Sequence, residues 1–365
     1  MSKLQTSLTP RQSCFGANPE PLGGVSSFGG SVAVLDTERG TGKNTHQLSP
    51  LQRRARALSY SKVLSDQLAR VTKSEVMRRS YLRTRDQCGS IIEQIPGEGL
   101  KSYHCKSRHC LSCARARTAK MIDAYFPTIS QWIENGEAYH VVLTVKNVSE
   151  DLLRPTIQMM HKEYALCIRA LRRKLSGEVQ AMRSTECTAN LTGDVPMYHP
   201  HLHIIIRGKE HAELLVNEWL YRHPTTAVRS AQSITKASGV GSAKELLKYA
   251  TKTLDSKKGE DGTRLIVPPP VLDVIFCALR KLRLFQASQI EPAVQVEEDE
   301  LEEGEIVYDK VTAITKNPNE YCVWSWTPDV YDWVCGATGE TLSDYEPSRH
   351  TLSVIRQFTE WDDKG

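Results

Sequence analysis

The chain has no apolar run approaching the roughly 20 residues that a membrane span requires, and its first residues lack the apolar stretch of a signal peptide. These absences predict a cytoplasmic protein with no membrane partner. Most of the ten cysteines are scattered, which argues against the disulfide framework of a small secreted domain. A phosphate-binding loop is missing too, because Thr37 stands where the motif ending near residue 45 requires its first glycine.

The acidic residues are distributed unevenly. Residues 291–305 hold eight of them and no Lys or Arg, which predicts an acidic linker. The net charge of the whole chain is +4, so without the eight acidic residues of this stretch the rest of the chain has a net charge of +12 (4 plus 8). Such a surplus favours a polyanionic partner, since phosphate neutralisation drives nucleic-acid affinity.

Composition predicts five regions. They are a disordered tail rich in Gly, Ser, Pro and Thr (1–50), a basic helical and Cys-rich module (51–125), a sheet domain (126–290), the acidic linker (291–305), and a small aromatic-rich region (306–365). The Trp and Tyr residues of the last region predict a small β core, and a docking or base-stacking surface is the alternative.

Periodicity predicts an α+β fold. The expected helices are 51–86, 119–132, 157–175, 210–221, 242–254 and one that follows Pro268–Pro270, and the expected strands are 139–145, 197–207 and 226–235. The first helical segment holds ten basic residues against three acidic ones, which suits either a solvated face or contact with the DNA backbone.

The clearest chemical pattern is the run from Tyr198 to Ile206. Successive strand residues point to opposite faces, so His199, His201 and His203 share one face while Leu202 and its apolar neighbours enter the core. A lone strand histidine is usually structural, but imidazole is the commonest neutral metal ligand and here several are adjacent. We therefore expect His201 and His203 to bind a divalent ion, with His199 or an acidic residue elsewhere as the third ligand.

A second pattern lies on the helix expected at 242–254. A four-residue step places Glu245 and Tyr249 on one face and stacks Lys244, Lys248 and Lys252 beside them. A phenol next to cations can attack a phosphate, provided that its phenolate is stabilised. The alternative is structural, since Ser242 and Glu245 match a capping box and Tyr249 can pack against the sheet.

A third pattern is the cysteine group. Cys110 and Cys113 form a C-x-x-C knuckle, Cys105 adds a thiolate, and the fourth ligand of a zinc site is Cys88, His104 or His109, of which Cys88 is favoured. Arg115 and Arg117 follow at once, so the module is expected to order a basic DNA-contacting surface. An unliganded group or a redox C-x-x-C is the alternative.

Together these residues resemble the rolling-circle plasmid replication initiators, within the HUH endonucleases. The resemblance covers about 88–289 and rests on five segments. They are Cys105–Cys113, with Leu111 where the family usually has Pro, a core strand at Val141–Val145, the histidine motif at His199–His203, the helix Glu245–Lys252, and a closing basic stretch at Ala278–Leu284.

The resemblance implies a five-stranded antiparallel sheet with the histidines on a central strand and the nucleophile on a facing helix. It implies that Tyr249 attacks an origin phosphate to leave a 5′-phosphotyrosine and a free 3′-hydroxyl, with Mg²⁺ or Mn²⁺ held by His201 and His203. In the single-tyrosine branch the residue matching Glu245 activates water for the terminating cleavage. The implied partners are plasmid origin DNA, supercoiled or as a single-stranded hairpin, and the helicase and polymerase of a bacterial host.

Two other functions are weighed against this one. A conjugative relaxase usually has its tyrosine upstream of the histidines, whereas Tyr249 lies downstream of them. A zinc-dependent DNA-binding regulator would use the histidines structurally and would bind the origin without cutting it.

Overall fold

A computed structural model describes residues 48–96, 99–238, 255–258, 264–294, 306–309 and 320–361. Within these ranges the chain is α+β, with seven α-helices and antiparallel sheets. None of the described helices is both long enough and apolar enough to cross a bilayer. Residues 1–47 of the tail predicted at 1–50, residues 295–305 of the acidic linker predicted at 291–305, and the segment 239–254 lie outside the described residues.

The elements follow in chain order. They are α1 (Pro50–Val71), α2 (Glu75–Asp86), β1 (Ile91–Ile95), β2 (Gly99–Tyr103), α3 (Leu111–Glu134), β3 (Ala138–Thr144), α4 (Glu150–Leu175), β4 (Ala181–Asn190), β5 (Met197–Arg207), α5 (Lys209–Arg222), the 3-10 turn η1 (Arg229–Ala231), β6 (Ser233–Lys236), β7 (Asp255–Lys258), β8 (Arg264–Ile266), α7 (Pro269–Leu279), β9 (Phe285–Ser288), β10 (Ile306–Asp309), β11 (Cys322–Thr327), β12 (Asp332–Cys335) and α8 (Arg349–Thr359).

One five-stranded antiparallel sheet, the histidine sheet, has the strand order β6-β3-β5-β4-β9. The central strand β5 pairs with β3 on one side, where Thr144 lies opposite His201, and with β4 on the other, where Glu186 lies opposite His201. β5 has the bounds that the sequence predicts. The strand expected at 226–235 is mostly η1 and irregular backbone, and only β6 at its end joins the sheet.

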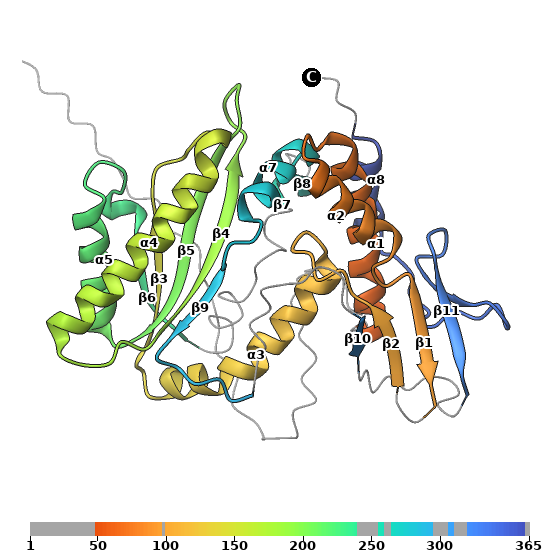
Figure 1. The fold of residues 1–365 in the computed structure, drawn as a ribbon, viewed down its shortest axis with the longest axis horizontal. Helices are drawn as coiled ribbons and strands as arrows, with labels where there is room; N and C mark the ends of the chain where they lie inside the picture. The colour runs from red at the N-terminus through yellow and green to blue at the C-terminus, as the bar shows by residue number, and fades with distance from the viewer. Residues whose placement is uncertain are drawn as a thin grey trace, which may run out of the picture. The chain divides into compact units, whose positions relative to one another are not determined.

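Helices cover the two faces of the histidine sheet unequally (Figure 1). On one face Leu202, Ile204 and Ile206 are fully buried in a core with α4 and α5, as the period-two alternation predicts. On the other face α3 packs over Ile205 and Met182. The part of this second face that holds His201 and His203 lies beyond that core.

A second five-stranded antiparallel sheet, the aromatic sheet, has the order β10-β2-β1-β11-β12. It joins strands that the sequence analysis placed in two separate regions, because Ile91–Gln94 pairs with Cys322–Ser325. Trp324, Trp333 and Tyr345 are buried with α1 residues on one of its faces. The C-terminal aromatics therefore build a β core, as predicted, and they share it with the N-terminal helix.

The N-terminal helical segment breaks into two helices. Ser49 and Gln52 form a capping box at the start of α1, with Pro50 in the first turn. The segment 72–74 separates the helices, and Ser74 caps α2. Both helices share a core with α7 and α8. Sequence periodicity missed α8, β4 and β9, and it missed the hairpin of β1 and β2.

Candidate functional site

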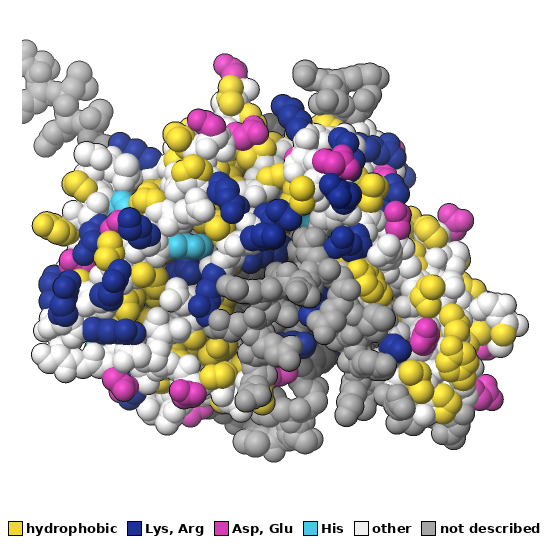
Figure 2. All heavy atoms as spheres, viewed as in Figure 1, with side chains coloured by type: hydrophobic (Ala, Val, Ile, Leu, Met, Phe, Trp, Pro, Cys, Tyr) yellow, Lys and Arg dark blue, Asp and Glu magenta, His cyan; other side chains and the backbone are white. Residues whose placement is uncertain are grey.

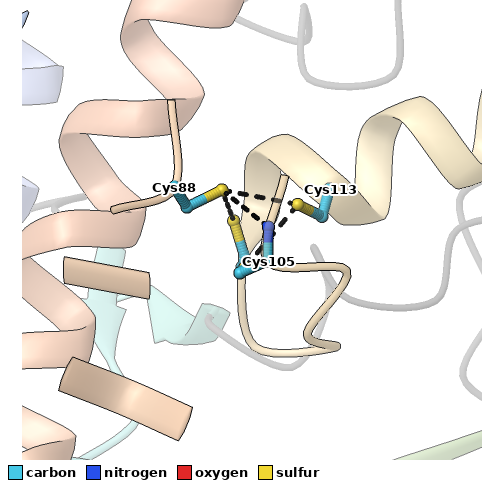
Figure 3. A group of neighbouring side chains, drawn as sticks. Cys88, Cys105 and Cys113 are labelled. Atoms are coloured by element: carbon cyan, nitrogen blue, oxygen red, sulfur yellow. Dashed lines mark hydrogen bonds between the residues drawn. The ribbon is translucent and has the colours of Figure 1, made fainter. Parts of the chain in front are cut away.

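Three separate segments bring four cysteines together. Cys88 follows α2, Cys105 follows β2, Cys110 is the N-cap of α3, and Cys113 lies in its first turn. Figure 3 shows Cys88, Cys105 and Cys113 pointing toward one another. Gly89 turns the chain after Cys88 with φ of +63°, where an added Cβ would approach the Leu58 side chain to 3.2 Å. The cluster therefore joins α2, the β1–β2 hairpin and α3 at one point.

The sulfur spacing suits a tetrahedral metal ion. Cys88 Sγ lies 3.7 Å from Cys110 Sγ and 3.5 Å from Cys113 Sγ, and Cys105 Sγ lies 3.7 Å from Cys113 Sγ. Zinc–sulfur bonds of about 2.3 Å place tetrahedral sulfurs ~3.8 Å apart, whereas a disulfide is about 2.0 Å long. All four cysteines are free and buried, so the group could hold a metal such as zinc.

The surroundings of the cluster favour a thiolate at Cys105, whereas hydrogen bonds within the cluster, above all to Cys105, raise the pKa values of Cys110 and Cys113 well above the usual value. Burial opposes ionisation of the Cys105 thiol, yet hydrogen bonds from Cys110, Cys113 and Cys88 hold its pKa well below the usual value. The Lys62 ammonium donates at 2.7 Å to the Arg85 carbonyl and to the Ser90 hydroxyl, and it interacts electrostatically with Cys88 and Cys110. Burial lowers the pKa of Lys62, and the charge it carries offsets part of the negative charge of Cys88, Cys110 and Cys105.

The two histidines named as alternative zinc ligands lie at the edge of the cluster. His104 Nδ1 is 3.8 Å from Cys113 Sγ, and His104 Nε2 contacts Arg54 at 3.1 Å. His109 Nε2 bonds the Thr84 hydroxyl at 2.8 Å, and burial lowers its pKa to about 4. Cys88, the favoured fourth ligand, lies within the cluster instead.

The histidine sheet brings a second group together. Glu186 on β4 and His201 and His203 on β5 lie on one face, with all three candidate ligand atoms within 4.8 Å of one another. Glu186 Oε2 is 2.9 Å from His203 Nε2 and 3.4 Å from His201 Nε2. The three side chains are between 7% and 12% exposed, so a buried carboxylate faces two imidazoles, which favours a bound cation.

The Nε2 atoms of His201 and His203 both lie near one carboxylate oxygen of Glu186. His201 Nδ1 lies 3.1 Å from the His199 carbonyl, which can only accept, so Nδ1 carries the proton and Nε2 is left free to bind a metal. His203 Nε2 is buried and makes no hydrogen bond of good geometry to the described residues. An orphaned nitrogen beside a carboxylate fits a divalent ion with one carboxylate and two imidazole ligands.

His140 on β3 supports this arrangement from behind. Its Nε2 lies 3.2 Å from His203 Nδ1, and the two rings stack with centroids 5.3 Å apart. If His203 Nδ1–H donates to His140, the lone pair of His203 Nε2 is directed at Glu186. Neither His140 nor Glu186 is predicted from the sequence, although His140 lies on a predicted strand, on the same face as Thr144.

His199 lies outside the group of three. Its Nε2 hydrogen-bonds the Thr144 hydroxyl, and its ring centroid lies 5.3 Å from that of His201. Burial, and to a smaller extent His201, lowers the pKa of His199. The acidic alternative considered for the third ligand, rather than His199, is the one that the structure brings beside His201 and His203.

Of the remaining predicted site residues, the structure describes only Arg115 and Arg117. Tyr249, Glu245, Lys244, Lys248 and Lys252 lie outside the described residues. Arg115 and Arg117 are half-buried on the first turns of α3, and Arg117 donates at 2.7 Å to the carbonyl of Lys106. Lys106 has φ of +52°, so this bond braces a left-handed residue in the segment between Cys105 and Cys110.

Several of the N-terminal basic residues serve the fold. Arg53 and Arg56 are each 5% exposed, and Arg53 donates to the Leu48 carbonyl at 2.9 Å. Arg85 pairs with Asp66 and Asp86 at 2.9 and 2.6 Å. Arg70, Lys73 and Arg79 are exposed. Figure 2 shows Lys and Arg side chains gathered over α4 and the two N-terminal helices.

Residues 100–211 match the family model of a replication protein. That segment is similar to a replication protein. It includes three of the four clustered cysteines and the whole group of Glu186, His201 and His203, and it ends before Tyr249. No curated protein and no solved structure matches the chain. The match supports a role in plasmid replication and contact with DNA at an origin.

Proposed function

We propose that the chain is a rolling-circle plasmid replication initiator of the single-tyrosine HUH class. The observation that carries the proposal is the Glu186–His201–His203 group on the central strands of a five-stranded antiparallel sheet. It lies within the segment that is similar to a replication protein. A three-ligand group with an open position is typical of catalytic metal sites.

Glu186, His201 and His203 would hold Mg²⁺ or Mn²⁺, which when bound would polarise the scissile phosphate and stabilise its developing charge. Tyr249 would attack the phosphorus through its phenol oxygen. The new bond is a 5′-phosphotyrosine, the bond to the 3′-oxygen breaks, and that oxygen gains a proton to become the 3′-hydroxyl that primes synthesis. Glu245 would later activate the water for the terminating cleavage.

Origin DNA would contact the basic side chains on both sides of this chemistry. The proposed contacts are Arg115 and Arg117 beside the cysteine cluster and Lys244, Lys248 and Lys252 beside Tyr249. Exposed basic residues of α4, such as Lys162, Arg169 and Arg173, lie on the helix that covers the opposite face of the histidine sheet, so they are not among the proposed contacts. Zinc held by the four cysteines would fix α3 relative to the sheet, and the host would supply helicase and polymerase.

A nicking assay tests the proposal. The purified chain with Mn²⁺ is expected to convert a supercoiled plasmid carrying its origin to the open circular form and to remain covalently attached to the 5′ end. Tyr249→Phe removes the nucleophile and should abolish both products. Tyr221→Phe is the matched control, since Tyr221 is 80% exposed on α5.

Three outcomes count against the proposal. Cleavage by Tyr249→Phe at the wild-type rate would exclude the nucleophile. Normal origin binding with no cleavage under any divalent ion would instead support the zinc-dependent regulator. Covalent attachment that maps to a tyrosine upstream of the histidines would favour a relaxase.

A further inference from the structure

The aromatic sheet holds a pair of cysteines far from both candidate metal groups along the chain. Cys322 begins β11 and Cys335 ends β12, on neighbouring antiparallel strands. Their sulfur atoms are 2.9 Å apart. This is much shorter than the ~3.8 Å edge of a tetrahedral zinc–thiolate site and longer than a disulfide of about 2.0 Å. The pair is therefore spaced for bond formation between the two sulfurs rather than for sharing a metal.

The two thiols differ in their protonation. Hydrogen bonds from Cys322, from the Thr338 hydroxyl and from the Thr338 and Ala337 amides lower the pKa of Cys335 to about 7. Burial and the bond to Cys335 raise the pKa of Cys322 to about 11. Thiol–disulfide exchange proceeds by attack of a thiolate on a disulfide sulfur, and this pair holds a thiolate directly beside a second thiol.

The backbone holds this geometry in place. After β12 the chain turns back, with the Gly339 amide donating to the Cys335 carbonyl at 2.8 Å and the Cys335 amide donating to the Glu340 carbonyl at 2.9 Å. Cys335 has 2% of its surface exposed, whereas Cys322 is partly exposed at the start of its strand. A reagent in solution would therefore reach Cys322 first, and the Cys335 thiolate, 2.9 Å away, can accept the Cys322 proton as the Cys322 sulfur attacks.

We propose that Cys322 and Cys335 form a reversible redox pair that exchanges with a small disulfide such as glutathione disulfide. The sulfur of Cys322 bonds to one sulfur of glutathione disulfide, and one glutathione leaves with the proton that Cys322 gives up, which Cys335 passes on. The Cys335 sulfur then displaces the second glutathione, which leaves with the other proton. Two protein thiols are oxidised to one disulfide, and one glutathione disulfide is reduced to two glutathiones.

Oxidation would act on the sheet next to the cysteine cluster. The disulfide would tie the edge strand β12 to β11, which pairs with β1. Trp333 on β12 donates its indole N–H at 2.6 Å to the carbonyl of Gly89, the residue after Cys88. The cross-link would therefore hold Trp333 against the turn that positions Cys88, and we expect it to raise the melting temperature by about 5 °C.

A glutathione titration of the zinc-loaded, full-length protein tests the proposal. After equilibration at increasing shares of glutathione disulfide, samples are quenched in acid, alkylated with N-ethylmaleimide and digested with trypsin. No Lys or Arg lies between Lys316 and Arg349, so one peptide contains both cysteines. It should change from doubly alkylated to unalkylated, lighter by two hydrogens than its reduced form, and dithiothreitol should reverse the change.

Three variants sharpen the result. Cys322→Ser and Cys335→Ser should each abolish the oxidised peptide and the rise in melting temperature. Cys277→Ser should leave both intact, because Cys277 faces the carboxylate of Asp273 rather than another thiol. The wild-type titration stands without the variants, so a variant that fails to fold does not remove the test.

Three results would overturn the redox pair. The first is full alkylation of both cysteines even in glutathione disulfide alone. The second is glutathione that stays attached to Cys322 without being displaced. The third is a zinc content of two ions per chain, with Cys322 and Cys335 protected from alkylation until a chelator is added.

Discussion

The two candidate metal groups differ in how they are built. The four cysteines come from segments that are separate in the fold, and all of them are buried. Glu186, His201 and His203 come from two adjacent strands of one sheet, and they lie on its less covered face. Four thiolates complete the coordination sphere of a tetrahedral ion, whereas three protein ligands leave a coordination position open for water or substrate.

The difference indicates a structural role for the cysteine cluster and a catalytic role for the group of Glu186, His201 and His203. The cysteine cluster joins α2, the β1–β2 hairpin and α3 at one point, so its loss should unfold that junction. The backbone around the histidines is held by strand pairing on both sides and by the apolar core beneath, so their loss should leave the fold intact.

The largest effect is expected from breaking the cysteine cluster. Cys110→Ser removes one sulfur but leaves a residue suited to the N-cap of α3, and it should lose the bound zinc with a fall in stability of about 5 kcal/mol or more. That corresponds to a fall in melting temperature of roughly 10 °C or more, measured by calorimetry alongside zinc content. Cys277→Ser is the control. If Cys110→Ser keeps its zinc and its melting temperature, the cluster is not a structural metal site.

Breaking the histidine group should remove activity with little change in stability. His201→Ala deletes a ligand, so we expect Mn²⁺ binding, measured by calorimetric titration, and nicking to fall by at least about 100-fold, above the effect of residues that only orient ligands. The melting temperature should shift by no more than ~3 °C. His211→Ala, at the start of α5, is the control. Intact Mn²⁺ binding by His201→Ala would separate the histidines from any catalytic metal.

The sequence predicted the histidine strand well because its signal is local. Alternation of apolar and polar residues specifies both the bounds of β5 and the face of its histidines. β4 carries no such alternation, since Arg183, Ser184, Thr185 and Glu186 are polar and yet buried. Its place beside β5, and with it Glu186, follows only from pairing in three dimensions.

The aromatic sheet shows the same limit over a longer distance. β1 and β11 are separated by more than half of the chain, and no residue pattern in either of them specifies the other. Charge counting also overstated the basic surface of the first helices, because Arg53 and Arg56 are buried. Composition records how many cations a segment has but not which of them serve the fold.

His161 on α4 contacts β4 of the histidine sheet, and it should make the stability of this sheet, separately from that of the cysteine cluster, depend on pH. Its Nε2 accepts from the Thr185 hydroxyl at 2.7 Å, and that hydroxyl accepts from Arg183 at 3.2 Å. Burial, Arg183 and Arg108 lower the pKa of His161 to about 3. The unfolded chain therefore takes up a proton between pH 6.5 and 3 that the folded chain refuses, and stability falls as the pH drops through this window.

His161→Gln keeps a hydrogen-bonding side chain but removes the proton uptake. Between pH 7 and pH 4.5 its unfolding free energy, from urea titration, should fall by about 2 kcal/mol less than that of the wild type, allowing for the partial exposure of the ring. Protonation of the cysteines destabilises both proteins alike, so the difference between them isolates His161. Equal losses would show that the ring is protonated in the folded state.

The smallest effect is expected from His140, which contacts a candidate ligand without being one of the three. His140→Gln disturbs the contact of 3.2 Å that orients the His203 ring, so Mn²⁺ affinity should fall by about 10-fold with the melting temperature nearly unchanged. His211→Gln should change neither. A loss as large as that of His201→Ala would make His140 a ligand in its own right, and the open site would then have four protein ligands, as the cysteine cluster has. No loss at all would mean that strand pairing alone orients His203.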